Sequence, residues 1–184
     1  MEITMRLEYN YGQICLKVLN ENSASSVLKF YRDNKDIFDI YEPDKPDTFY
    51  THDFTANLLR AEYNLAIHNK HIRFFMFDSS VSDEIIGTVS FSNIINGAFH
   101  SCSIGYKIAK KYQHHGYAKK MLSMALDIMV RDWKMHRIEA YILPENIPSA
   151  SLVKSLGFIP EGVASSYAFM KGKWVDHLRF VYIS

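Results

Sequence analysis

The stretch from Phe99 to Leu143 constrains the fold most, because it has the pattern of a strand, a helix and a second strand. Phe99 to Ile108 is strand-like, residues 116–133 carry apolar side chains along one helical stripe, and Arg137 to Leu143 is strand-like again. A unit of this length joins two parallel neighbouring strands through a right-handed crossover. We therefore expect a sheet with a parallel pair of strands and a helix packed against it.

The remaining segments predict antiparallel strands and further helices. Asn96-Gly97 and Lys171-Gly172 each separate two strand-like runs, which is typical of a tight turn. The fold class is thus α/β: one mixed sheet with an antiparallel N-terminal meander, a central parallel strand pair, a C-terminal hairpin and helices on both faces. The elements expected outside the central unit are a leader over the first dozen residues, a strand Gln13 to Leu19, a helix capped by Asn22 or Ser23, a helix from about Tyr50 to Asn69, strands Ile72 to Phe77 and Ile85 to Ile94, a short helix capped by Asn146, and strands from about Phe158 to Tyr167 and Trp174 to Ile183.

Size and composition narrow the class of protein. The 184 residues suit one domain, 1–184, with a core from about residue 13 to 184, and no repeat or linker divides them. A net charge of +1 gives no reason to expect direct nucleic-acid or membrane binding. Cys15 and Cys102 lie in strand-like runs without metal-ligand spacing, so we expect reduced core thiols, no metal and a cytoplasmic location. Monomer and homodimer both remain open.

One charged segment stands out at the junction of the predicted strand and helix. Residues 107–120 contain five lysines and two histidines but no acidic residue. The first turn of a helix has free backbone N–H groups and a partial positive charge, which together bind anions. Gly116 allows close backbone approach, and the small Ala118 leaves room for a phosphate. A solvated lysine face is the alternative interpretation.

The segment Gln113-His114-His115-Gly116-Tyr117-Ala118 resembles the pyrophosphate loop of the GNAT acetyltransferase superfamily. The ordered set around it is similar to the ribosomal-protein N-acetyltransferase branch (RimJ/RimL-like) and spans about Gln13 to the C-terminus. That set comprises Ile104-Gly105-Tyr106-Lys107-Ile108, the loop, Arg137 to Ile142, Asn146-x-x-Ser149, Leu156-Gly157-Phe158 and the closing segment from Gly172 to Leu178.

This resemblance implies acetyl-CoA as co-substrate, laid between two diverging parallel strands. Ile108 and Ala109 would pair with the pantetheine arm, an N–H near Ile108 would polarise the thioester carbonyl, and one of Lys110, Lys119 or Lys120 would meet the 3′-phosphate. Asn146 would bind a pantetheine amide and Ser149 would protonate the departing thiolate, although helix capping is the structural alternative for both. The residues implied to hold the pyrophosphate by their backbone amides are Gln113, His114, His115, Gly116, Tyr117 and Ala118, with Lys119 beside them.

The general base is where the chain departs from the family pattern. Ser103 stands where relatives often carry glutamate, and Ala168 and Phe169 stand where relatives place an acid. His177, Glu139 and Tyr141 remain candidates for relaying a proton, each with an alternative as an ordinary strand residue. We expect no single indispensable base, which favours an acceptor that deprotonates easily, such as a protein N-terminal α-amine.

Other functions remain as alternatives. The same chemistry on a small amine (an amino acid, a polyamine or an antibiotic) would depend on the loop from Phe38 to Phe49, the second helix and the hairpin around Phe169 to Trp174. Acidic residues of the loop could attract such a cation, although a solvated loop is the preferred explanation for them: Asp39, Glu42, Asp44 and Asp47. A non-catalytic acyl-CoA-binding module and nucleic-acid binding through the lysine loop are two further alternatives, and the near-zero net charge disfavours the second.

Overall fold

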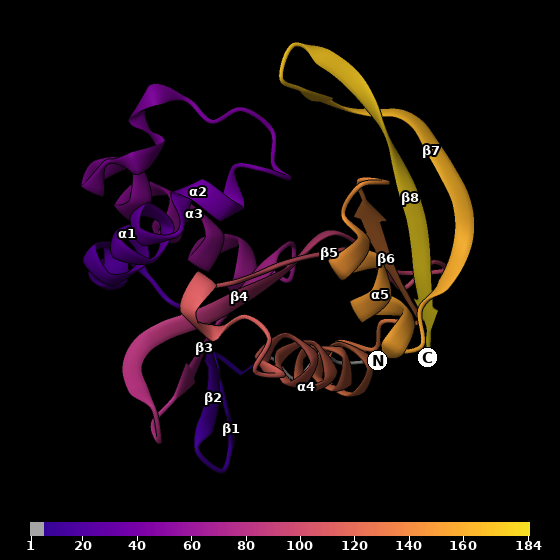
Figure 1. Ribbon diagram of the computed structural model, residues 1–184. Helices are drawn as coiled ribbons and strands as arrows, with labels where there is room; N and C mark the ends of the chain where they lie inside the picture. Colours follow the sequence, from indigo (N-terminus) through magenta and orange to yellow (C-terminus); the bar gives the residue numbers. More distant parts are fainter. Residues whose placement is uncertain (1–5) are drawn as a thin grey trace.

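A computed structural model describes residues 6–184 and contains one eight-stranded sheet (Figure 1). The strand order is β1-β2-β3-β4-β5-β6-β8-β7. The strands are β1 (Glu8–Tyr11), β2 (Ile14–Lys17), β3 (Ile72–Asp78), β4 (Ser82–Ile95), β5 (Ser101–Ile108), β6 (Arg137–Ile142), β7 (Ile159–Met170) and β8 (Lys173–Ile183). The helices are η1 (Glu21–Ser23), α1 (Ala24–Asp33), α2 (Lys35–Phe38), η2 (Asp47–Tyr50), α3 (His52–Ile67), η3 (Lys110–Tyr112), α4 (Tyr117–Arg131) and α5 (Ile147–Ser155).

The central strands β5 and β6 form the parallel pair that the sequence predicts, but they remain paired only briefly. Ser101–Ser103 pairs with Arg137–Glu139, whereas β5 continues to Ile108 and β6 continues to Ile142. The other neighbouring strands are antiparallel, including the N-terminal meander and the C-terminal β7–β8 hairpin. The two central strands therefore diverge beyond Ser103 and Glu139, which leaves one edge of each without a strand partner.

Helices cover both faces of this sheet, as expected (Figure 1). On one face, Gly87 of β4 lies opposite Ile108 of β5 and in contact range of Met121 on α4. On the other face, Arg73 of β3 reaches across to α3, where its guanidinium bonds both carboxylate oxygens of Glu62 at 2.7 and 2.8 Å. Side chains along β5 alternate between these faces, so Ile104, Tyr106 and Ile108 share the α4 face.

The N-terminal expectation is wrong within the described residues. Glu8–Tyr11 forms β1 rather than part of a leader, and it pairs with β2 across a two-residue turn at Gly12-Gln13. Gly12 has φ of +64°, a conformation that glycine adopts without strain. Ser23, one of the two expected caps, is the N-cap residue of α1 but makes no side-chain capping bond, and the short η1 before it is capped by Asn20, which accepts from the Asn22 N–H. Residues 1–5 of the expected leader lie outside the described residues.

A close approach of β4 to β5 makes Gly87 a sensitive position. A Cβ at Gly87 would lie 2.6 Å from the Lys107 carbonyl oxygen and 2.5 Å from Ile108 Cδ1. We expect Gly87→Ala to lower the free energy of unfolding by about 1–3 kcal/mol, because backbone must shift to relieve the collision. Urea denaturation measures this loss. Gly105→Ala is the matched control, since its Cβ would meet only Ser90 Oγ at 3.5 Å; an equal loss in both variants would contradict the steric explanation.

Candidate active site

The connection from β5 to α4 presents a row of free backbone N–H groups. Gly116 caps α4 in the left-handed conformation with φ of +80°, and His114 also has positive φ at +63°. Among residues 6–184, no hydrogen-bond acceptor is found for the N–H groups of six consecutive residues, His114 to Lys119. Three of them precede α4 and the other three lie in its first turn, where the helix dipole adds positive charge. This row has the donors and the field that a diphosphate requires.

The part of the connection before this row is already bonded within the protein. The Ala109 N–H donates to the Ile86 carbonyl at 2.9 Å, and the Gln113 N–H donates to the Lys110 carbonyl at 3.2 Å. Of the residues that we expect to bind the cofactor through backbone amides, Ala109 and Gln113 already have partners for their N–H groups, and the row of free N–H groups runs from His114 to Lys119. The Gln113 side chain instead reaches back to the Ile108 carbonyl at 3.4 Å.

The backbone of Ile108 points toward the gap between the diverging strands. In an antiparallel pair, successive residues direct their N–H groups to opposite edges of the strand. Because the Ala109 N–H is bonded toward β4, the N–H of Ile108 is directed away from β4, to the side that β6 has left. This is the geometry that an acyl thioester carbonyl in the gap would need for a hydrogen bond.

Asn146 and Ser149 lie at the start of α5, where they also take part in capping the helix. The Asn146 side chain accepts a hydrogen bond from the Ser149 N–H at 3.2 Å, so it caps the helix. The Ser149 Oγ lies 2.8 Å from the hydroxyl of Tyr106 on β5, which bridges the gap between β5 and α5. Burial raises the pKa of Tyr106 to about 12, although its hydrogen bond with Ser149 acts in the opposite direction.

The sequence did not single out Tyr106 as a partner of Ser149. The two residues are 43 positions apart, and only the crossover through α4 and β6 brings them together. The available signal was the alternation of Ile104, Tyr106 and Ile108 on one face, with the tyrosine as the one polar group among them.

The three candidate proton-relay residues gather on the opposite face of β6 and β8. The Tyr141 hydroxyl donates to Glu139 at 2.6 Å, and the Tyr141 ring stacks on Tyr167 with centroids 4.2 Å apart. Tyr167 in turn contacts His177, whose ring is 5.0 Å away. His177 is buried, and among residues 6–184 no partner is found for its Nδ1.

Glu139 is held as a carboxylate by its neighbours. Arg137 and Arg179 each donate to it at 2.7 Å. Burial alone would raise its pKa, but hydrogen bonds from Tyr141, Arg137 and Arg179 lower the pKa to about 2. A carboxylate with so low a pKa is a poor proton acceptor.

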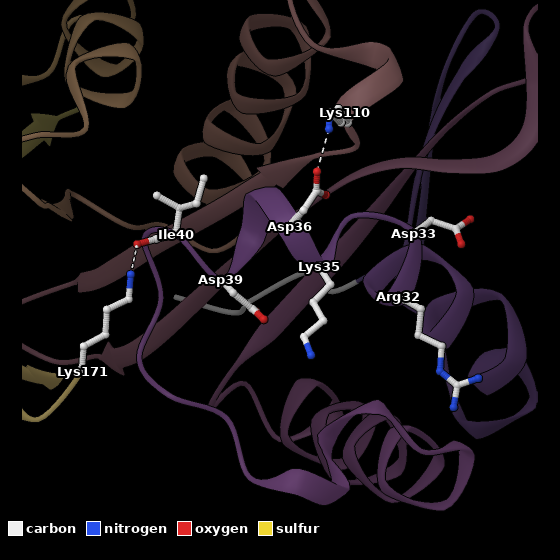
Figure 2. Close-up of a pocket in the computed structure, with 8 residues that line it drawn as sticks. All are labelled: Arg32, Asp33, Lys35, Asp36, Asp39, Ile40, Lys110 and Lys171. Carbon is white, nitrogen blue, oxygen red and sulfur yellow. Dashed lines mark hydrogen bonds and ion pairs between the residues drawn. The ribbon is translucent and has the colours of Figure 1, made fainter.

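The loop from Phe38 to Phe49 and the β7–β8 hairpin, which we expect to select the acceptor, contact each other. Lys171, at the tip of the β7–β8 hairpin, donates its N–H to Asp44 at 3.1 Å and its ammonium to the Ile40 carbonyl at 3.2 Å. Figure 2 shows Lys171 reaching Ile40 at the border of a pocket of about 680 Å³. The pocket is lined by Arg32, Asp33, Lys35, Asp36, Asp39, Ile40, Lys110 and Lys171. The exposed rings of Phe169 and Trp174 also lie at this hairpin tip, with centroids 5.7 Å apart.

The interpretation of the acidic loop as fully solvated is wrong for Glu42. Its side chain is 23% exposed and forms ion pairs with Lys107 of β5 and with Lys45, the latter at 2.8 Å. Burial acts to raise the pKa of Glu42, but these two ammonium groups lower it overall. The pair with Lys107 fixes the loop against the strand that borders the gap.

The lysines of the charged segment divide into two groups. Lys107, Lys110 and Lys111 pair with Glu42, Asp36 and Glu84. Lys119 and Lys120, on the first turn of α4, have no carboxylate partner in the described part of the chain. They are therefore the more available cations for a further phosphate.

Cys102 is unsuited to carry an acyl group. It is 2% exposed, and burial together with the Glu139 charge raises the pKa of its thiol to about 12. The thiolate needed for nucleophilic attack is accordingly scarce at neutral pH.

A mixed sheet with diverging central strands and an amide row beside them defines a transferase that uses an acyl-CoA. The chain belongs to the GNAT acetyltransferase family, whose domain model matches residues 13–159. It is an acetyl-CoA-dependent N-acetyltransferase.

Its relatives include ribosomal-protein acetyltransferases. The [ribosomal protein uS5]-alanine N-acetyltransferase of Escherichia coli is 31% identical over 169 residues, which cover 90% of this chain and 85% of that protein. The crystal structure of a ribosomal-protein-S5-alanine acetyltransferase from Vibrio fischeri superimposes with a TM-score of 0.89 at 28% identity, covering 97% of both chains. Mycobacterium smegmatis RimJ, solved with CoA-disulfide, has a TM-score of 0.86 at 25% identity, covering 93% of this chain and 82% of that one. Within residues 6–184, no helix has the length and apolar character to cross a membrane.

Proposed function

We propose that this enzyme transfers an acetyl group from acetyl-CoA directly to a protein N-terminal α-amine, with a ribosomal protein as the acceptor. The observation that carries the choice of amine is the state of Glu139, the carboxylate at the point where β5 and β6 diverge. With its pKa near 2 and two arginines bonded to it, this group gives little help in removing a proton. The uS5-alanine acetyltransferase relative supports the choice of a ribosomal protein.

The acceptor amines differ in how much deprotonation they require. An α-amine has a pKa of about 7.7–8, so roughly a tenth of it is neutral at pH 7. A lysine amine near 10.4 is only about 0.04% neutral, which amounts to a further cost of about 3–4 kcal/mol. An active site with a weak base therefore favours the α-amine.

The residues of the site have separate tasks in this mechanism. The N–H groups of residues 114–119 bind the diphosphate, with Gln113 completing the loop, and Asn146 binds the pantetheine arm along the edge of Ile108 and Ala109. The Ile108 N–H donates to the thioester carbonyl oxygen and stabilises the negative charge that develops as the amine attacks. The Ser149 hydroxyl, hydrogen-bonded to Tyr106, donates its proton to the departing thiolate. Direct attack requires both substrates to be bound together.

No single side chain acts as an indispensable base in this account. We expect His177→Asn, Glu139→Gln and Tyr141→Phe each to lower kcat by less than about 100-fold, because roughly a tenth of an α-amine is already neutral at pH 7 and needs no base. Steady-state kinetics with a free-N-terminal peptide would measure this. A loss near 10³-fold in any one variant would identify that residue as the base and contradict the account.

The test of acceptor class is a thiol-release assay with three kinds of amine. Peptides with a free N-terminus are compared with N-terminally blocked lysine peptides and with small amines, at equal concentration and pH. We expect the free-N-terminal peptides to have a kcat/KM at least about tenfold higher, as the difference in deprotonation cost demands. A small amine is the second candidate, supported by the spermidine N(1)-acetyltransferase of Vibrio cholerae, which is 28% identical to this chain over 117 residues, and a preference for polyamines in the assay would favour it.

The whole chain acts as one catalytic domain in this proposal, since one sheet runs from β1 to β7 and β8. The cytoplasm is the compartment we propose, since Cys15 and Cys102 are both buried free thiols. The acceptor would dock on a monomer or on one subunit of a homodimer.

A further inference from the structure

Asn34 is a buried side chain at the junction of α1 and α2, far in sequence from the loop that it contacts. It is 6% exposed. Its Oδ1 accepts the Lys110 N–H at 2.7 Å, and its Nδ2 donates to the Phe30 carbonyl at 2.8 Å. Both ends of the amide are thus satisfied, which fixes its orientation and makes the loss of either partner costly.

The Asn34 bond holds a specific point of the β5–α4 connection. Lys110 is the first residue of η3, four positions before the free amide row begins at His114. In residues 6–184, Asn34 is the one side chain from another segment that bonds the backbone of residues 109–116. The Lys110 ammonium also pairs with Asp36, but both side chains are more than half exposed, and such pairs contribute little.

We propose that Asn34 is a positioning residue for coenzyme A. By fixing the Lys110 peptide, it sets where the amides of residues 114–119 stand relative to the edge of β5. Diphosphate binding depends on several N–H groups meeting their acceptors at hydrogen-bond distance together, so a small displacement of the loop weakens all of them. This inference depends on the proposed placement of the diphosphate on that row.

The same bond links the two substrate sides of the enzyme. The backbone carbonyl of Asn34 accepts the Phe38 N–H at 3.0 Å. After Phe38, the chain continues into the loop that contacts Lys171. Asn34 therefore joins the segment that borders the acceptor pocket to the segment that carries the free amides.

Lys110→Pro and Lys110→Ala separate the backbone bond from the side chain. Proline removes the N–H that Asn34 accepts and leaves Asn34 itself in place. The site tolerates proline, because Lys110 is the first residue of a 3₁₀ turn and Ala109 before it is extended, with φ of −57° and ψ of 140°. Alanine removes the same side chain but keeps the N–H.

Calorimetry with coenzyme A is run on both variants and on the wild type, with urea unfolding in parallel. We expect Lys110→Pro to bind coenzyme A roughly tenfold more weakly than Lys110→Ala. We expect kcat at saturating acetyl-CoA to stay within about threefold, because the Ala109 N–H, next to Ile108, is held separately by the Ile86 carbonyl. Equal affinities in the two variants would overturn the proposal. Failure of the wild type to bind coenzyme A would instead refute the diphosphate site, and this inference with it.

Substitutions of Asn34 provide the second readout. Asn34→Leu removes the acceptor and is expected to weaken coenzyme A binding roughly tenfold. Asn34→Asp keeps an oxygen for the Lys110 N–H but loses the donor to Phe30, so we expect lower stability with affinity within about threefold of the wild type. If both variants lost stability and neither lost affinity, Asn34 would be a structural residue only.

Discussion

Replacing Ala118 with glutamate is expected to weaken coenzyme A binding about 100-fold or more, while the protein still folds. Ala118 lies in the first turn of α4, within the row of free amides, and is half-buried. A carboxylate there competes for the same N–H groups and repels the diphosphate. The helix itself tolerates the change, because an acidic side chain near a helix N-terminus stabilises by about 0.3–1 kcal/mol.

A second glutamate on the same helix provides the control for this prediction. Ser123 is exposed on α4, beyond the first turn, so Ser123→Glu adds the same charge away from the amide row. Calorimetry should find its affinity for coenzyme A within about threefold of the wild type, because exposed charges at that separation are largely screened. Equal weakening by both substitutions would indicate a general charge effect and remove the support for a local anion site.

Ser149→Ala is expected to lower kcat by about 100-fold and to leave the KM for acetyl-CoA nearly unchanged. Loss of a general acid typically costs about 10²–10⁴-fold, and the lower end applies where water can replace the hydroxyl. Steady-state kinetics with both substrates varied measures the effects on kcat and on KM separately. A raised KM with an unchanged kcat would show that Ser149 serves binding or capping instead.

Removal of the Tyr106 hydroxyl is the matched comparison for removal of the Ser149 hydroxyl. Tyr106→Phe removes the group 2.8 Å from Ser149 Oγ but leaves Ser149 as a donor, so we expect a smaller loss of kcat. The double variant should be no slower than Ser149→Ala alone, because the two hydroxyls act as one unit. Multiplication of the two single losses would contradict this coupling.

Much of the fold could be predicted from local patterns. The strand–helix–strand unit, the hairpin turns and the cap at Asn146 all depend on neighbouring residues, and the structure confirms them. The strand β1 was missed because only Tyr9 of its four residues is buried, which leaves no alternation to recognise. The early end of β5–β6 pairing was expected only from the family resemblance, since periodicity predicts that two strands are neighbours but not how far they stay paired.

The features of the candidate site also fall into local ones, which a sequence pattern can predict, and contacts between distant segments, which it cannot. The anion loop stays a prediction; the structure shows free N–H groups from His114 to Lys119 in this segment, and an η3 turn that engages the Gln113 amide, which was not expected. The contacts that organise the site join distant segments: Asn34 meets Lys110 across 76 positions, and Tyr106 meets Ser149 across 43. Such contacts depend on the packing of whole elements, which a single sequence does not reveal.

The most direct measurement is a crystal structure of the protein with coenzyme A. We predict that the diphosphate oxygens lie within about 2.7–3.2 Å of backbone nitrogens between His114 and Lys119, with the pantetheine arm in the gap between β5 and β6. A diphosphate bound elsewhere on the surface, with these nitrogens still facing water, would contradict the account.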